Sequence, residues 1–157
     1  MCSSDLGAPF DLYLAADIAY LQSLADEGLA NPDTVFRYGT GRVVVWVPNE
    51  SRVDLEGRGA AVLLDPVVRR IAIANPRHAP YGRAAEAALE HFGLGEKVAE
   101  KIVYAANVAE AAQFVQSGAA DAALIALALA ESPAMKANGR FSLVPADAHP
   151  PRSEEHT

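Results

Sequence analysis

Two short turns hold the residue types best suited to binding an anion without a countercharge. Residues 79–82 read Ala-Pro-Tyr-Gly and residues 106–108 read Ala-Asn-Val, each between an apolar strand-like segment and a helical pattern. A helix start presents backbone N–H groups and the positive end of the helix dipole. Pro80 has no N–H, and Gly82 lets backbone or ligand approach closely. Both turns are therefore candidate anion sites, with Tyr81 and Gly82 in the first and Val108 and Asn107 in the second, where Gly82 and Asn107 are the weaker candidates.

An ordinary helix start is the competing interpretation of each turn. Proline is common at the first position of a helix, and for Pro80 alone the ordinary start is the better explanation. Asn107 and Glu110 have capping-box spacing, which places a second helix start directly after a strand. In parallel sheets, ligands bind beyond the carboxyl ends of the strands, where such turns meet. Two turns in succession strengthen the case for an anion site, and both interpretations stay open at this point.

Other kinds of chemistry find no support in the residue pattern. His78 and His91 have no serine or cysteine nucleophile at a recognisable elbow, and the four histidines lack metal-ligand spacing. Gly39-Thr40-Gly41 lacks the lysine of a phosphate loop and precedes a strand. We therefore expect no catalytic residues, no enzyme activity, no cofactor and no metal bound by direct coordination.

Composition limits the partners. The chain has 157 residues, 51% of them hydrophobic, and a net charge of −7. No apolar run approaches the roughly 18–20 residues that span a bilayer, and the N-terminus has no secretory signal pattern. Lysine and arginine are scattered, with no basic stripe. We expect no nucleic-acid partner, no membrane insertion and a monomer.

The two ends differ from the rest of the chain. Back-translating residues 152–157 (RSEEHT) gives a DNA strand whose complement encodes residues 1–6 (MCSSDL), if GTG is the start codon. This reciprocity is typical of a ligated sequencing adaptor. We therefore exclude 1–6, which hold the lone Cys2, and 152–157 from the fold prediction, and expect the genuine part to be an internal fragment truncated at both ends.

Strand and helix patterns alternate between these ends, which predicts an α/β fold with a largely parallel sheet. Residues 49–59 are expected to form a loop. Gly93 is expected to end the helix that begins at Pro80, with Leu94 as its hydrophobic follower. The expected strands are 9–17, 41–48, 69–75, 101–106, 122–127 and 139–145, and the expected helices are 17–27, 59–65, 80–92 and 107–117.

Several segments, in this order and spacing, resemble the periplasmic molybdate-binding proteins of ABC-type importers. The most specific are the turn ANPRHAPYG (74–82) and the run NVAEAAQFVQSGAAD (107–121). The likeness extends over 7–151 and implies a truncated two-lobed, Venus-flytrap (type II) periplasmic-binding-protein fold. It assigns 7–40 and 141–151 to a partial first lobe and 41–140 to the second.

The resemblance also implies the ligand and its donors. Members of this family bind molybdate or tungstate through neutral donors and deliver it to a membrane permease, from the periplasm or the cell surface. Their pattern gives the oxyanion a backbone N–H at positions that fall on Tyr81 and Val108. A tyrosine hydroxyl of some members falls on Ala126, so that donor is absent here or replaced, for example by the Tyr81 side chain.

Two serine-bearing turns of the family would precede Gly7. If each lost hydrogen bond is worth roughly 1.5–3 kcal/mol, the fragment should bind on the order of 10²–10⁴ times more weakly than its parent, and calorimetry with molybdate would test this. The alternatives are an effector-sensing, oxyanion-binding domain of a transcription regulator and a sulfate-type anion-binding protein. An enzyme on the same scaffold is disfavoured, because no nucleophile or acid–base pair is found.

Overall fold

The strands and helices of the chain form two separate units. The computed structural model describes residues 11–15, 18–145 and 152–156, and of 37–40 and 152–156 only the backbone. Unit 1 comprises the described residues up to Thr40 together with 152–156, and unit 2 begins at Gly41. Within the described part of the chain, no helix is long and apolar enough to cross a membrane.

Unit 1 consists of a small sheet and one helix. The sheet has the order β1–β8–β2, from β1 (Leu14–Ala15), β8 (Arg152–His156) and β2 (Phe36–Gly41), and β1 and β8 are antiparallel. Helix α1 (Ile18–Asp26) confirms the expected helix 17–27, whose first residue, Asp17, lies outside the described residues. The 3₁₀ helix η2 (Pro32–Thr34) is capped by Asn31. Among the described apolar side chains of unit 1, only Leu21 is buried.

Two strands of unit 1 differ from the sequence prediction. Strand β2 was not predicted, because its segment FRYGTG has neither alternating nor continuous apolar character. Strand β8 lies in the hexapeptide excluded as adaptor-derived. Of the predicted strand 9–17 the structure describes residues 11–15, and of these only Leu14–Ala15 form β1. The pairing of β1 with β8 does not test the origin of these residues, so the adaptor interpretation stays a prediction.

Unit 2 is built on a five-stranded mixed sheet with the order β5–β4–β6–β3–β7. Strand β4 is parallel to β5 and β6, whereas β3 is antiparallel to β6 and β7. The expected largely parallel sheet is therefore correct for β5, β4 and β6 and wrong for β3, because the apolar run of β3 fits a buried strand of either direction. The strands are β3 (Val43–Pro48), β4 (Ile71–Ala74), β5 (Ile102–Ala105), β6 (Ala122–Ala126) and β7 (Gly139–Leu143).

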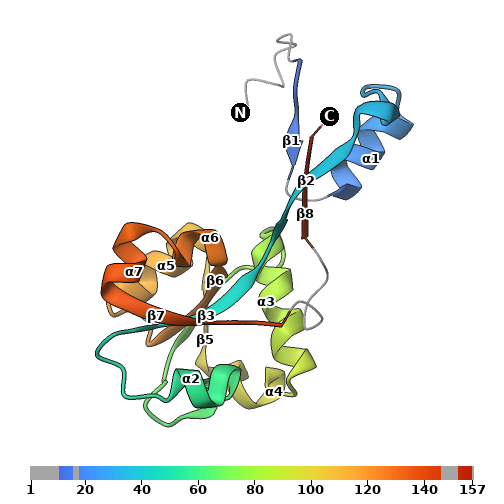
Figure 1. Cartoon of the computed structure of the whole chain (residues 1–157). Helices are drawn as coiled ribbons and strands as arrows, with labels where there is room; N and C mark the ends of the chain where they lie inside the picture. The colour runs from blue at the N-terminus through green and yellow to red at the C-terminus, as the bar shows by residue number, and fades with distance from the viewer. Residues whose placement is uncertain (1–10, 16–17, 146–151, 157) are drawn as a thin grey trace. The chain divides into compact units, whose positions relative to one another are not determined.

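Helices cover both faces of this sheet (Figure 1). Alternate residues of β3 face opposite ways: Val43, Val45 and Val47 join the core cluster under α2, α3 and α4, while Val44 and Trp46 join the cluster under α5, α6 and α7. Trp46 is thus a core residue. The helices are α2 (Leu55–Arg58), η3 (Gly59–Leu64), α3 (Pro80–His91), α4 (Gly95–Val98), η4 (Ala99–Lys101), α5 (Val108–Gln116), α6 (Leu127–Ala130) and α7 (Pro133–Asn138).

The short helices account for most other differences. Residues 49–59 were expected to be a loop, but α2 forms within them because the Asp54 side chain accepts a hydrogen bond from the N–H of Gly57. Helices of four to six residues, such as α4, α6 and α7, are too short to show a helical period. The predicted end of α3 is confirmed: Gly93 has φ +64°, and the N–H of Leu94 bonds to Leu89 O at 2.8 Å.

The predicted lobe boundaries stay a prediction. Unit 2 begins at Gly41, the position where the second lobe was expected to start. Residues 141–143 lie in β7, which pairs with β3 of unit 2, although the prediction placed 141–151 in the first lobe. Residues 146–151 lie outside the described residues.

Candidate functional site

The candidate site lies at one edge of the sheet of unit 2. Strands β4, β5 and β6 are parallel, so their carboxyl ends, Ala74, Ala105 and Ala126, share this edge. Helices α3, α5 and α6 begin after these three strands. The antiparallel β3 starts at the same edge, with Val43 opposite Ala126. The sheet therefore directs several helix starts to one side.

A compact turn links β4 to α3. The side-chain oxygen of Asn75 accepts a hydrogen bond from the N–H of Arg77 at 3.0 Å. The backbone carbonyl of Asn75 accepts one from the N–H of Ala79 at 2.8 Å. Ala79 is the N-cap of α3 and has no side-chain oxygen with which to cap the helix. The first turn of α3 contains no acidic residue. Neither the cap residue of α3 nor a carboxylate within its own first turn therefore closes this helix start.

Gly82 allows the start of α3 to lie directly on the end of β4. A Cβ atom at position 82 would overlap the carbonyl oxygen of Ala74 and would lie 2.8 Å from the carbonyl carbon of Asn75 and from the nitrogen of Pro76. All three neighbours are backbone atoms, which cannot rotate away as a side chain can. Gly82 therefore holds the first turn of α3 in position by close backbone packing.

The start of α5 is capped by side chains, but among the described residues one of its backbone N–H groups keeps no acceptor. The Asn107 side chain accepts a hydrogen bond from the N–H of Glu110 at 2.9 Å, and the Glu110 carboxylate accepts one from the N–H of Ala106. This reciprocal arrangement confirms the capping-box prediction. Val108, the first helical residue, has no acceptor for its N–H among the residues that the structure describes. Its N–H can therefore bind a ligand.

One hydrogen bond joins the two turns. The N–H of Asn75, just after β4, donates to the carbonyl of Ala105, at the end of β5, at 2.8 Å. The structure thus brings Tyr81 with Gly82, and Val108 with Asn107, to the same edge of the sheet. Whether they bind a ligand stays a prediction, which geometry alone does not test.

Ala126 lies at the same edge. It ends β6, is buried and stands opposite Val43 of β3. Its methyl group offers no donor, and the short helix α6 that follows has four residues. Ala126 can therefore shape the edge but contributes no side-chain hydrogen bond.

Two arginines beside the α3 turn were missed by the sequence interpretation. A cavity of about 580 Å³ is lined by Asn75, Pro76, Arg77, Arg83, Glu86 and Tyr104. Nη1 of Arg83 donates to the carbonyl of Pro76 at 3.4 Å. The signal in the sequence is the pair of arginines that flank the Ala79–Gly82 turn. Both side chains are exposed, so they contribute positive potential rather than a desolvated ion pair.

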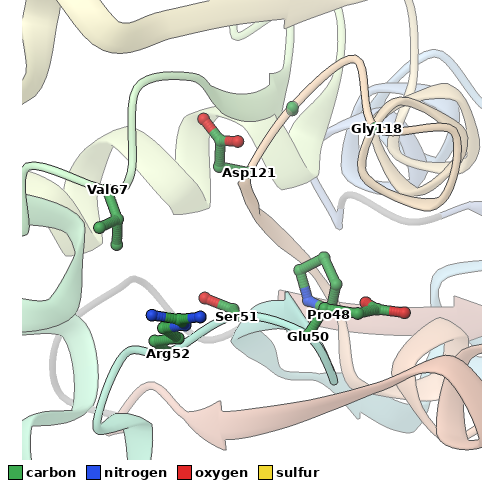
Figure 2. Close-up of a pocket in the computed structure, with 8 residues that line it drawn as sticks. Pro48, Glu50, Ser51, Arg52, Val67, Gly118 and Asp121 are labelled. Atoms are coloured by element: carbon green, nitrogen blue, oxygen red, sulfur yellow. The ribbon is translucent and has the colours of Figure 1, made fainter.

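A second cavity, of about 360 Å³, lies away from the candidate site. Figure 2 shows Pro48, Glu50, Ser51 and Arg52 on one side of it, with Gly118 and Asp121 on the other. Pro48 ends β3 and Asp121 precedes β6, so this cavity lies at the opposite edge of the sheet. The Asp121 carboxylate accepts hydrogen bonds from the N–H groups of Arg69 and Arg70, at 2.8 and 2.9 Å. Asp121 thus anchors the start of β4.

Direct metal binding finds no candidate either. Among the described residues, no three histidine, cysteine, aspartate or glutamate side chains are grouped closely enough to hold a metal ion. His149 and Cys2 lie outside the described residues. The chemistry available at the edge is therefore hydrogen bonding from backbone N–H groups, which suits an oxyanion.

Removing the cap of α5 should cost stability and binding together. We expect Asn107→Ala to lower the free energy of unfolding by about 1 kcal/mol, because the Glu110 N–H loses its acceptor. Asp54→Ala is the matched control, since it removes the cap of α2 at a comparable cost. Urea unfolding followed by circular dichroism measures both changes. Only Asn107→Ala should also weaken binding of the oxyanion that the sequence predicts at Val108, and equal binding losses in both variants would contradict that prediction.

The fold and this edge define a class of protein: an α/β protein in which helices α3, α5 and α6 begin at the carboxyl ends of three parallel strands. The chain matches, over residues 5–154, the family described as bacterial extracellular solute-binding protein. The chain belongs to this family. These proteins bind solutes for transport and are not enzymes, in agreement with the sequence prediction.

Two relatives that match most of this chain are both molybdate-binding proteins. The molybdate-binding protein ModA of Azotobacter vinelandii is 37% identical over 145 residues, which cover 92% of this chain and 56% of that protein. The ModA of Rhodobacter capsulatus is 32% identical over 149 residues, 95% of this chain and 56% of that protein. The chain therefore spans a little over half the length of these relatives.

A solved structure confirms the fold. The periplasmic molybdate-binding protein of Azotobacter vinelandii superposes with a TM-score of 0.81 at 35% identity, covering 98% of this chain and 66% of that one. The predicted periplasmic-binding-protein fold is thus correct, and the chain represents part of it.

Proposed function

We propose that this chain is part of a binding protein that captures molybdate or tungstate for an ABC-type importer. The observation that carries the proposal is the joining of two helix starts, α3 and α5, at one sheet edge through the hydrogen bond from Asn75 to Ala105. The names of the ModA relatives supply the ligand. The family description places such proteins outside the cytoplasmic membrane, and we expect delivery of the ligand to a membrane permease by a monomer.

Tyr81 and Val108 would each donate a backbone N–H to an oxygen of the ligand. A tetrahedral oxyanion carries its charge on oxygens, so donors rather than metal-coordinating side chains bind it. The Glu110 carboxylate lies in the first turn of α5, as Val108 does. It accepts a hydrogen bond from the N–H of Ala106, which directs it toward the residue after the end of β5. Helix dipoles and oriented N–H groups can then balance a ligand charge although the whole chain is acidic.

Amide NMR provides the direct test. We expect titration of the ¹⁵N-labelled chain with sodium molybdate, up to the low-millimolar range, to move the amide proton resonances of Tyr81 and Val108 downfield. A hydrogen bond to a charged oxygen deshields the donor proton, and weak binding is still visible by this method. The amide of Gly57, at the start of α2, serves as the internal reference because it is already capped by Asp54.

Matched titrations separate the oxyanion from general salt effects. Sodium chloride at equal ionic strength should leave both resonances in place, and sulfate should move them less than molybdate because it is smaller at the same charge. The proposal fails if molybdate moves neither resonance. It also fails if the shifts are confined to Arg77 and Arg83, which would place the anion in the neighbouring cavity instead.

A further inference from the structure

Gly41 is a buried glycine whose lack of a side chain provides room for Tyr81. A Cβ atom at position 41 would overlap the hydroxyl oxygen of Tyr81 and would lie 3.1 Å from its Cζ atom. The backbone does not demand glycine here, since among the described glycines only Gly28, Gly59, Gly93 and Gly118 have positive φ. The requirement at position 41 is therefore for space.

The Tyr81 side chain extends from the start of α3 to the start of β3. Its ring is half-buried and packs against the core cluster that contains Val43 and Ala84. Arg42 follows Gly41, and its backbone carbonyl accepts a hydrogen bond from the N–H of Leu127 at 2.8 Å. Val43 then pairs with Ala126. The phenol thus reaches the part of the edge where β3 and β6 meet.

We propose that Gly41 is a positioning residue of the oxyanion site, because the space above it fixes the ring of Tyr81 and, through it, the Tyr81 N–H. This inference rests on the proposed function. The ring and the N–H belong to one residue in the first turn of α3. The backbone of this turn already packs closely, at Gly82, against the end of β4. A side chain at position 41 would push the phenol away and would turn this first helical turn with it.

A double-mutant cycle tests this coupling. Gly41→Ala should weaken molybdate binding at least about tenfold, the loss expected for one misplaced hydrogen bond to a charged group. Tyr81→Phe removes the oxygen that the new Cβ atom would meet, and its measured affinity is the reference for the double variant. Gly41→Ala in the Tyr81→Phe background should then recover the affinity of Tyr81→Phe alone.

Two spectroscopic readouts separate positioning from simple loss of stability. In Gly41→Ala, molybdate should still move the Val108 amide resonance but should no longer move that of residue 81. Without ligand, the Gly82 amide resonance should shift in Gly41→Ala and should return in the double variant to its position in Tyr81→Phe. Gly95→Ala is the control, because a Cβ atom there meets only the Glu90 side chain and backbone at ordinary distances.

Specific results would overturn the inference. Wild-type affinity together with an unmoved Gly82 resonance in Gly41→Ala would show that position 41 does not position Tyr81. An affinity loss that persists in the double variant would show that the effect does not pass through the phenol. If molybdate moves no resonance of the unaltered chain, the proposed function fails, while the ligand-free Gly82 resonance still decides whether Gly41 positions Tyr81.

Discussion

Gly82→Ala should lower the free energy of unfolding of unit 2 by about 3 kcal/mol. This value is the upper part of the usual range for overpacking, because the added Cβ atom would meet backbone atoms of Ala74, Asn75 and Pro76. The better helix propensity of alanine, about 1 kcal/mol, would not offset the collision. Urea unfolding can be followed by the fluorescence of Trp46, the only tryptophan in the chain and a buried residue of unit 2.

Gly95→Ala provides the comparison for this experiment. Gly95 starts α4, and a Cβ atom there has only ordinary contacts with Glu90, so alanine should be neutral or stabilise by up to about 1 kcal/mol. Gly82→Ala should also abolish the molybdate-induced shift of the Tyr81 amide, because α3 would have to move away from β4. A stability loss below about 0.5 kcal/mol in Gly82→Ala would contradict the close packing of this turn.

Trp46→Ala should destabilise unit 2 by about 3–5 kcal/mol, the usual effect of deleting a buried aromatic side chain. Trp46 is 1% exposed and packs in the core cluster under α5, α6 and α7. Its ring lies against Gly139, where a Cβ atom would overlap it, so no neighbouring side chain can fill the space from that side. Circular dichroism in urea measures the change without relying on the deleted fluorophore.

Trp46→Phe separates lost volume from lost hydrogen bonding. The indole Nε1 of Trp46 has no hydrogen-bond partner among the described residues, so phenylalanine removes no such bond. We therefore expect Trp46→Phe to cost clearly less than Trp46→Ala. Equal losses in the two variants would show that the indole nitrogen, rather than the packed ring, stabilises this core.

Local sequence signals were sufficient for the elements that carry the two turns. Strands β4 and β5 are short apolar runs, and both were predicted within a few residues of their ends. The start of α5 follows from the spacing of Asn107 and Glu110, and the end of α3 follows from Gly93 and Leu94. Each of these features depends on residues close together in the chain, so the sequence alone reveals it.

Elements without a local signal were missed. Strand β2 has no apolar alternation, and the four residues of α2 form because Asp54 caps them. The antiparallel direction of β3 was also missed, since its valine run fits a buried strand of either direction. Strand direction depends on partners far away in the sequence.

By itself, the sequence determined the α/β alternation and the helix ends at Asn107 and Gly93. It also predicts that two helix starts together form an anion site. Only the tertiary structure decided how these turns meet: the Asn75 N–H bonds to Ala105, and Gly82 lies against Ala74. It also showed that Gly41 makes room for Tyr81, 40 positions further along the chain. The physical reason is that caps and hydrophobic periods act over three or four residues, whereas close packing between distant residues leaves no periodic pattern in the sequence.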